Sequence, residues 1–349
     1  MKSRDLMFLA PTALALTSAL VVSQVSPALS QPPDPFATTA AIVLGVGSTN
    51  IDAERSGTSV GIVVGGTLYV FDAGPGVERR ILEARPKLEA MKVQKLGPVF
   101  ISHLHIDHTL GLAALLFYNN LSGNLSALDG VTRIPGDGRL QTGGQLTVYG
   151  PGPARGARGI RELIDGLRAS LFSPVVAPGI KEEGQAGRDG PQVEATEIKP
   201  GVIYKDSNVT VTAFEVEHKT PIAFGFRIQT PDRVIVISGD TRPSDAVVKA
   251  CNGCDLLFHE VYGMRFSPGG PTGNAQGHTS AEELGVLAGR ARPKRLVVYH
   301  DPLSVQGLGG LDLIRKAFSG EVSFARDLDI FCRQDGKQSA LACRGAPSF

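Results

Sequence analysis

The sequence predicts an α/β fold in which two β-sheets pack face to face and helices cover their outer faces. Apolar segments of strand length alternate with segments of helical character, most regularly in the second half of the chain. Polar side chains recur at the ends of these apolar segments, namely Asp72, His103, His218, Asp240, His259 and His300. Such side chains converge when the strands lie side by side, so the pattern predicts a site built from strand ends.

The first half of the chain is expected to hold strands separated by Gly-rich turns, and three helices. The expected strands cover 40–46, 59–64, 67–71, 98–101 and 146–149, and the expected helices cover 77–84, 109–116 and 157–170. Asp72 follows the third strand beside a glycine, where an acid commonly fixes a neighbouring loop through hydrogen bonds. We therefore expect Asp72 to be structural.

The second half returns to strands alternating with helices. Strands are expected at 209–216, 222–229, 234–237, 255–258 and 295–299, and helices at 243–250, 279–290 and 311–318. Thr279 or Ser280 is expected to cap the second of these helices, with two glutamates in its first turn. The polar, Gly-rich stretch 179–192 is expected to be a loop or flap.

The stretch 103–108 concentrates four residues that can bind metal. It follows an apolar strand and reads His103, Leu, His105, Ile, Asp107, His108. In an extended loop, His103 and His105 project to one side, whereas Asp107 and His108 lie past the bend and can reach a second metal. Single histidines are usually surface or core residues, but four such side chains in six positions need a reason to crowd together. Imidazole and carboxylate ligands suit zinc or a similar divalent ion.

Charge and composition limit the partners of this chain. The formal net charge is +1, and the first thirty residues contribute a net +1 of their own, so the remainder is near neutral. A large phosphate-binding face would need a surplus of Lys and Arg, so nucleic acid is not expected as a partner, although a local basic patch is compatible with this balance.

The N-terminus reads as a targeting segment. Lys2 and Arg4 precede a mostly apolar run that Pro11 interrupts, and small residues lie before Ser30. This pattern favours a secretory signal peptide at 1–30 over an uncleaved membrane anchor, because the run is short for a full span. Residues 31–39 then form a tail, 40–349 form a single domain, and the protein is expected to be periplasmic or secreted, with no stable membrane span.

Four cysteines are consistent with disulfides in an exported protein. Cys332 and Cys343 could clamp a hairpin near the C-terminus. Cys251 and Cys254 could form a local disulfide or a redox pair. The connectivity remains open at this point.

Taken together, these residues resemble the metallo-β-lactamase superfamily, and within it the group of ribonuclease Z and the zinc-dependent arylsulfatases. The matching pieces are the histidine motif at 103–108, His218, Ser-Gly-Asp-Thr at 238–241, His-Glu at 259–260, Gly-His-Thr-Ser at 277–280 and His300. The resemblance extends from about residue 40 to the end. It implies a four-layer αββα sandwich and two zinc ions per chain, with manganese as an alternative ion.

Carried over by position, the resemblance also implies the ligand sets. His103, His105 and His218 would hold the first metal. Asp107, His108 and His300 would hold the second. Asp240 would bridge the two ions.

The implied chemistry is hydrolysis by a metal-bound hydroxide, which two neighbouring cations stabilise near neutral pH. Asp107 could orient that hydroxide. His278 is the expected proton donor to the leaving oxygen, with Glu260 holding its ring, and the alternative for His278 is a helix-start residue without a catalytic duty. His259 is expected to be structural.

The leading hypothesis is therefore an exported dinuclear zinc hydrolase of a small sulfate ester or phosphodiester. The alternatives are an RNA phosphodiesterase like ribonuclease Z, and a lactone or thioester hydrolase. Export and the absence of a long basic arm between His108 and His218 weigh against the RNA reading. A metal-binding module without turnover is disfavoured because ligands and proton donor are all present. Whether the chain forms a homodimer stays open.

Overall fold

The computed structural model is described here for residues 39–49, 53–91, 93, 95–116, 146–171, 193–266, 276–301 and 305–332. All of them belong to one compact unit, Pro35–Phe349. The predicted signal peptide at 1–30 and residues 31–38 of the predicted tail at 31–39 lie outside these residues. Thr39 is buried, and its hydroxyl contacts the hydroxyl of Thr230 at 2.8 Å.

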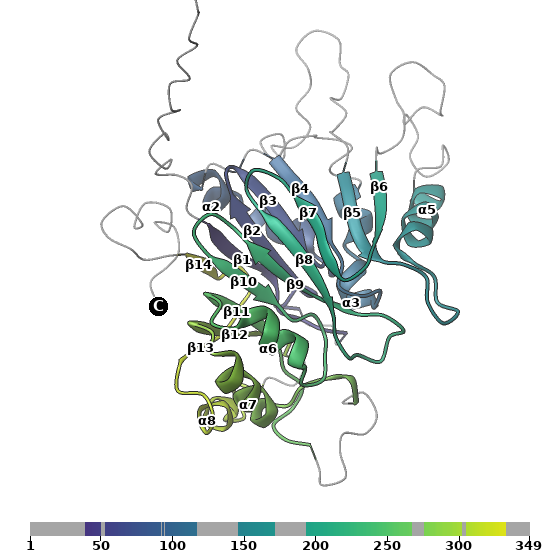
Figure 1. The fold of residues 1–349 in the computed structure, drawn as a ribbon. Helices are drawn as coiled ribbons and strands as arrows, with labels where there is room; N and C mark the ends of the chain where they lie inside the picture. Colours follow the sequence, from purple (N-terminus) through teal and green to yellow (C-terminus); the bar gives the residue numbers. More distant parts are fainter. Residues whose placement is uncertain are drawn as a thin grey trace, which may run out of the picture. The chain divides into compact units, whose positions relative to one another are not determined.

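The strands among these residues form two seven-stranded sheets (Figure 1). In spatial order, the first sheet consists of β14 (Ile330–Cys332), β1 (Ala40–Gly45), β2 (Ser59–Val64), β3 (Thr67–Phe71), β4 (Lys95–Phe100), β5 (Leu146–Pro151) and β6 (Val193–Ile198). The second consists of β13 (Glu321–Phe324), β12 (Arg295–Tyr299), β11 (Leu256–Glu260), β10 (Val234–Ile237), β9 (Phe224–Gln229), β8 (Thr210–Glu215) and β7 (Gly201–Lys205). Both sheets are mixed: each has an antiparallel part and a run of parallel strands.

An aromatic layer lies between the two sheets. Phe71 and Phe100 of the first sheet stack at 4.8 Å between ring centroids, and Phe71 contacts Phe226 of the second sheet at 5.5 Å. All three rings are buried. This shared core holds the sheets face to face, as the sequence pattern predicts.

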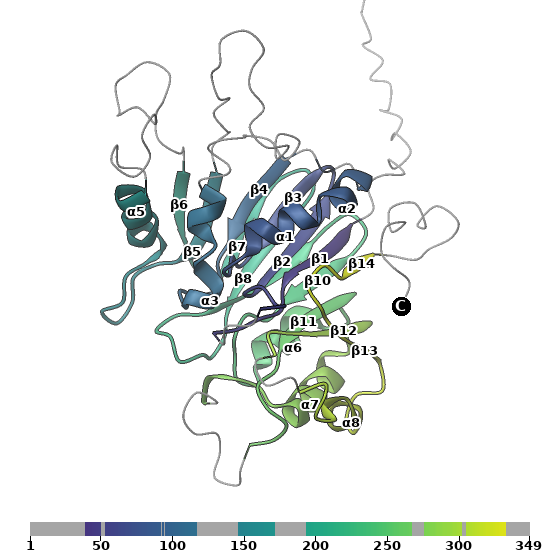
Figure 2. The ribbon, with the colours of Figure 1, turned by 180° about the vertical axis from the view of Figure 1, so that it is seen from behind.

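Helices cover the outer faces of the sheets. The helices are α1 (Val77–Glu83), α2 (Arg85–Ala90), α3 (Ile106–Thr109), α5 (Ile160–Leu171), α6 (Asp245–Cys251), α7 (Ala281–Ala291) and α8 (Gly310–Arg315). Figure 2 shows α1 and α2 over the first sheet, where they share a second apolar cluster, and α6, α7 and α8 bury a third cluster against the second sheet. The predicted four-layer αββα sandwich is confirmed.

The expected strands at 59–64, 67–71, 234–237 and 295–299 coincide with β2, β3, β10 and β12, and most other expected elements are present with ends shifted by a few residues. The expected helix at 109–116 is divided, because α3 begins at Ile106 and helical structure resumes at 112–116. The strands that the sequence did not predict are β6, β7, β13 and β14. Each of these lies at an edge of its sheet, where a strand is half exposed and needs no apolar run. The short helix α2 was also not predicted.

The carboxyl ends of parallel strands meet at one edge of the molecule. β10, β11 and β12 pair in parallel, and so do β3 and β4. The two sheets are joined at this edge, because the amide of Phe224 at the start of β9 donates to the carbonyl of Ser102 just after β4 (3.0 Å). Within the described ranges, none of the helices has the length and apolar character that crossing a bilayer requires.

Candidate metal centre

The loop after β4 changes conformation within the histidine motif. His105 is extended and precedes α3, whose first turn carries Asp107 and His108. The hydroxyl of Thr109 donates to the carbonyl of His105 at 2.9 Å and closes this turn. The bend therefore divides the motif, with His103 and His105 before it and the two remaining candidates after it.

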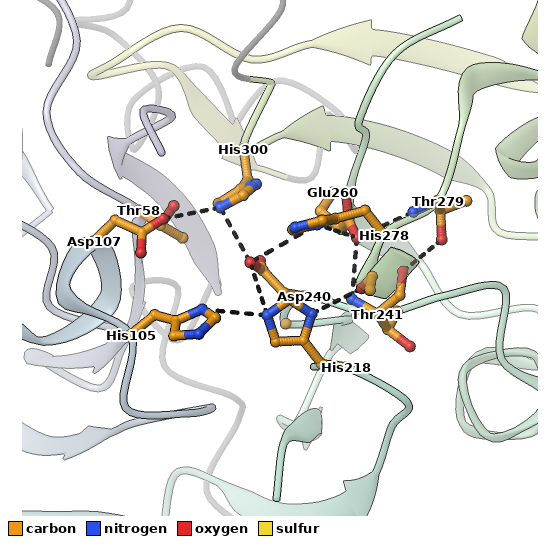
Figure 3. Close-up of polar contacts among 12 residues, drawn as sticks. Thr58, His105, Asp107, His218, Asp240, Thr241, Glu260, His278, Thr279 and His300 are labelled. Atoms are coloured by element: carbon orange, nitrogen blue, oxygen red, sulfur yellow. Dashed lines mark hydrogen bonds and ion pairs between the residues drawn. The ribbon is translucent and has the colours of Figure 1, made fainter. Parts of the chain in front are cut away.

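The first group of candidate ligands consists of His103, His105, His218 and Asp240. One ligand atom from each lies within 4.8 Å of the others. The Nε2 atoms of His103 and His218 are each 3.8 Å from Oδ2 of Asp240. Figure 3 shows the Asp240 carboxylate between His218, His278 and His300, at the middle of the cluster.

The second group consists of Asp107, His108, Asp240 and His300, again within 4.8 Å of one another. The Nε2 atom of His300 is 3.2 Å from Asp107 Oδ2 and 3.3 Å from Asp240 Oδ2, and His108 Nε2 is 3.4 Å from Asp240 Oδ1. Asp240 belongs to both groups. The structure thus brings together all seven residues that the resemblance implies as ligands, in the same two sets.

The donor atoms fit a pair of divalent cations. Asp107 Oδ1, His108 Nε2 and Asp240 Oδ1 are buried and make no hydrogen bond within the described residues. A buried polar atom without a partner costs about 1–3 kcal/mol, and coordination of a cation removes this cost. Imidazole nitrogens with carboxylate oxygens are a donor set that zinc accepts.

Asp72 orients the second ligand group through its contact with His108. The ring Nδ1–H of His108 donates to Asp72 Oδ2 at 2.9 Å, and the amide and hydroxyl of Ser102 donate to the same carboxylate at 2.7 and 2.9 Å. The expectation that Asp72 fixes the loop is confirmed. Because Nδ1 of His108 is engaged, Nε2 is the atom presented to a cation.

His278 and Glu260 form a buried pair beside these groups. The Nδ1–H of His278 donates to Glu260 Oε1 at 3.0 Å, and the same oxygen accepts from the amides of Thr241 (3.0 Å) and Thr279 (3.3 Å) (Figure 3). His278 precedes α7, which Ser280 caps through a capping box with Glu283. Because the Nδ1 atom of His278 is engaged with Glu260, its Nε2 atom remains available to contact a ligand.

A cavity of about 360 Å³ opens over the cluster. Its lining includes His105, Asp107, Asp240, His278 and His300. Both candidate metal groups and the candidate proton donor therefore face one space.

Comparisons with known proteins agree with this arrangement. Residues 155–300 match the model of the β-lactamase superfamily domain. The chain is 24% identical over 329 residues to ribonuclease Z of Bacillus subtilis. This alignment covers 79% of this chain and 92% of that protein. It is 27% identical over 302 residues to ribonuclease BN of Escherichia coli, with 76% and 88% covered. The crystal structure of the metallo-β-lactamase fold protein YhfI from Bacillus subtilis superposes with a TM-score of 0.60 at 18% identity, covering 85% of this chain and 100% of that one.

Residues 155–300 thus carry a β-lactamase superfamily domain, and the described part of the chain has the metallo-β-lactamase fold. The chain is a hydrolase of the metallo-β-lactamase fold and is homologous to ribonucleases Z and BN. Proteins with this fold typically bind divalent metals such as zinc, and the two His/Asp groups are clusters that could hold such ions.

Burial sets the charge of the first ligand group. It lowers the pKa of His103 and His105, and it lowers the pKa of His218 to about 4. These rings are neutral near pH 7, as metal ligands must be. Burial also acts to raise the pKa of Asp240, but the surrounding His300 and His108 rings outweigh it and hold that pKa well below the ordinary value.

The environment of His278 favours the protonated ring. Burial works against the charge, yet the hydrogen bond and the negative charge of Glu260 outweigh it and raise the pKa of His278 above the ordinary histidine value. A raised pKa keeps on this ring the proton that a general acid must deliver.

His259 lies apart from the ligand groups. It is fully buried, its Nδ1–H donates to the carbonyl of Glu260 at 2.8 Å, and burial lowers its pKa to about 4. Among the described residues it belongs to neither metal group. This position agrees with the structural role expected for it.

Thr241 and Tyr262 contribute to the candidate site but were not predicted from the sequence. Thr241 donates its amide to Glu260 and accepts the hydroxyl of Thr279 at its carbonyl (2.7 Å), so it fixes the pair described above. Tyr262 lines the cavity and stacks on His278. Thr241 ends the Ser-Gly-Asp-Thr motif, one residue past Asp240, and Tyr262 lies two residues past Glu260, just outside the His-Glu motif.

Cys251 and Cys254 form a disulfide between the end of α6 and the start of β11. Both are buried, and this agrees with the local disulfide named as one of two alternatives. The predicted pair of Cys332 and Cys343 includes Cys343, which lies outside the described residues.

Proposed function

We propose that this protein is a phosphodiesterase that uses two divalent cations, zinc or alternatively manganese, to hydrolyse short phosphodiesters. The observation that carries the proposal is the sharing of Asp240 between two ligand groups, with the His278–Glu260 pair on the same cavity. When bound, two such cations supply an activated water and charge stabilisation for the phosphoryl oxygens.

His278, Glu260 and Asp107 have separate roles in the proposed hydrolysis. Water attacks phosphorus, the bond from phosphorus to the leaving oxygen breaks, and a phosphomonoester and an alcohol result. His278 donates the proton that the leaving oxygen takes up, and Glu260 holds its ring in place through Nδ1. Asp107 has two carboxylate oxygens, so one can hold a cation while the other accepts a hydrogen bond from the attacking water and orients it.

The relatives favour the phosphodiester over the sulfate ester. Both proteins named above by sequence are ribonucleases, and RNA cleavage breaks a phosphodiester bond. The sulfate-ester alternative has no comparable support, so it enters only as an arm of the test.

Charge favours a short substrate over a long RNA. The chain beyond residue 30 is near neutral. A second hollow of about 580 Å³ shares His218 and Lys219 with the cavity, but its cations Arg155, Lys219 and Arg242 lie among the acids Glu215 and Glu217. A polyanion gains affinity from a surplus of cations that releases many counterions, and this mixed lining provides little.

A substrate panel tests the proposal. Enzyme loaded with zinc, or with manganese, is assayed on bis(4-nitrophenyl) phosphate, 4-nitrophenyl sulfate, a lactone and an RNA with a 3′ extension. We expect turnover of the diester that a chelator abolishes and either metal restores. A sulfate or lactone turned over more efficiently than the diester would overturn the phosphodiesterase proposal, and efficient RNA cleavage would overturn its restriction to short substrates.

We also propose that the protein is exported, on the basis of the N-terminal pattern of residues 1–30. Expression of the full chain in a Gram-negative host and N-terminal sequencing of the periplasmic fraction should give a first residue near position 31. Recovery of the uncut chain in the cytoplasm or membrane would contradict export.

A further inference from the structure

The cavity over the metal centre has an apolar wall, formed by Leu104, Ile106 and Tyr262. The ligand candidates occupy the rest of its described lining together with a few polar residues. A phosphoryl group and two cations need only the polar side. The apolar wall therefore faces a part of the substrate other than the phosphate.

Ile106 is exposed in an unusual place. Its side chain is 59% exposed although it stands between His105 and Asp107, whose positions at the cluster fix the local backbone. A large aliphatic side chain left open to water beside a catalytic cavity is characteristic of ligand contact. The local geometry prevents Ile106 from withdrawing into the core without moving its neighbours.

Tyr262 is held rigidly against the candidate proton donor. Its ring is stacked on the imidazole of His278, with 4.9 Å between centroids and 19° between planes. Its amide donates to the carbonyl of Thr279 at 2.8 Å, and the next carbonyl, of Gly263, accepts from the amide of Ala281 at 3.0 Å. These two bonds fix the backbone of Tyr262 and Gly263, and the stacking on His278 fixes the ring, so the ring offers a flat face at little cost in conformational entropy.

The position of the wall relates it to one end of the substrate. His278 delivers its proton to the leaving oxygen, so the group attached to that oxygen lies next to His278. Tyr262 stacks on His278 and lines the cavity, so its ring lies next to the leaving alcohol. Ile106 and Leu104 line the same cavity and face the same space.

We propose that the apolar wall is a leaving-group subsite that selects phosphodiesters whose leaving alcohol carries an aromatic ring. The ring packs on Tyr262 and Ile106 while the phosphoryl group lies at the metal centre. This inference rests on the proposed phosphodiesterase function and adds the chemical class of its substrate.

The kinetic test uses two diesters, methyl phenyl phosphate and methyl hexafluoroisopropyl phosphate, whose leaving alcohols have similar acidity but differ in the aromatic ring. We expect kcat/KM of the zinc enzyme to favour the phenyl diester by ~10-fold or more, and Ile106→Ser and Tyr262→Ala each to reduce that ratio several-fold. Tyr262→Phe should retain it, because the ring and not the hydroxyl makes the contact. Val202→Ser removes an equally exposed apolar side chain on β7, outside the cavity, and should leave the ratio unchanged.

The outcomes separate a subsite from a supporting role. If the variants lose the same factor on both diesters, Tyr262 and Ile106 only support the centre, and the subsite proposal is overturned. The same conclusion follows if the unmodified enzyme cleaves both diesters equally well.

A binding measurement separates this inference from the proposed function. Calorimetric titration of the zinc-loaded protein should show benzylphosphonate binding ~10-fold more tightly than ethylphosphonate, and Ile106→Ser should reduce the difference. Preference for benzylphosphonate without turnover of any diester would remove the phosphodiesterase and keep the subsite. Turnover of diesters with equal binding of both phosphonates would remove the subsite and keep the phosphodiesterase.

Discussion

Asp240 is the residue on which the candidate centre depends most. It is nearly fully buried, follows β10, and is the one described residue shared by the two metal groups. Gly239 before it has φ of +60°, and a Cβ there would lie 2.6 Å from the carbonyl oxygen of Phe224. The chain therefore needs glycine at 239 to bring Asp240 to the place where the two sheets meet.

Replacing Asp240 by Ala should lower the bound metal. Both groups lose an oxygen donor at once, so we expect elemental analysis of the purified variant to find clearly less zinc per chain than in the unmodified protein. Asp245→Ala, which removes an exposed acid from α6, is the matched control and should keep its zinc. Unchanged zinc in the Asp240 variant would show that the bridge is misassigned.

Replacing His278 by Ala should separate turnover from metal binding. The His278 ring is held by Glu260 and is implied as a proton donor, so kcat on the diester should fall by ~100-fold or more while the zinc content stays intact. Glu282→Gln changes a half-exposed acid in the first turn of α7 and serves as the control. Normal turnover in the His278 variant would remove this residue from the mechanism.

At the scale of elements, the hairpin of β7 and β8 is fastened to the opposite sheet by one carboxylate. Asp206 accepts hydrogen bonds from the hydroxyls of Tyr69 on β3 (2.6 Å) and Tyr204 on β7 (2.9 Å), and from the amides of Asn208 and Val209 (2.8 Å each). Partial burial acts to raise the pKa of Asp206, but these four donors outweigh it and lower that pKa. A lowered pKa means that the ionised carboxylate stabilises the folded state.

Asp206→Asn should therefore destabilise the protein in a pH-dependent way. The stabilisation is present above the unfolded-state pKa of about 4 and is lost as pH falls through the lower folded-state pKa. We expect a loss of ~1–2 kcal/mol in the free energy of unfolding at pH 7, a modest figure because the site is partly exposed, and a smaller loss below pH 4. Denaturant unfolding of the metal-free protein at both pH values measures this, with the exposed Asp312→Asn on α8 as control. An equal loss at both pH values would mean that the stabilisation does not depend on the charge of Asp206.

At the scale of the whole compact unit, the candidate centre joins the two sheets. His103 and Asp107 come from the loop after β4 of the first sheet, whereas His218, Asp240 and His300 follow strands of the second. A cation held by both sets crosslinks the layers. Binding that occurs in the folded state and not in the unfolded one raises the stability of the whole.

Removal of metal should accordingly lower the melting temperature. At zinc concentrations about a hundredfold above Kd, binding contributes ~2.7 kcal/mol, which corresponds to a rise in Tm of about 4 °C for a domain of this size. Calorimetry of the chelated and the zinc-loaded protein measures the difference, and Asp240→Ala should reduce it. Identical melting temperatures in the presence and absence of zinc would argue against a centre that spans both sheets.

Residues close together in the chain were enough to predict the parts whose geometry is local. These parts are the histidine motif, its division at the start of α3 and the central strands. A local cue, the glycine near Asp72 at a strand end, indicated the structural role of Asp72, although its hydrogen-bond partners Ser102 and His108 lie 30 and 36 residues away. The four edge strands β6, β7, β13 and β14 did not follow, since their polarity reflects neighbours that only the assembled sheets supply.

Which distant side chains meet depends on the packing of the two sheets and could not be predicted from their order in the chain. The resemblance implied the ligand sets, but spacing along the chain could not place His300 3.2 Å from Asp107, 193 residues earlier. It could not place Tyr262 flat against His278 either, because the stacking depends on the hydrogen bond to Thr279 across the start of α7. The physical reason is that bond geometry fixes direction over a few residues, whereas contacts between separate strands exist only after two sheets have packed on a common core.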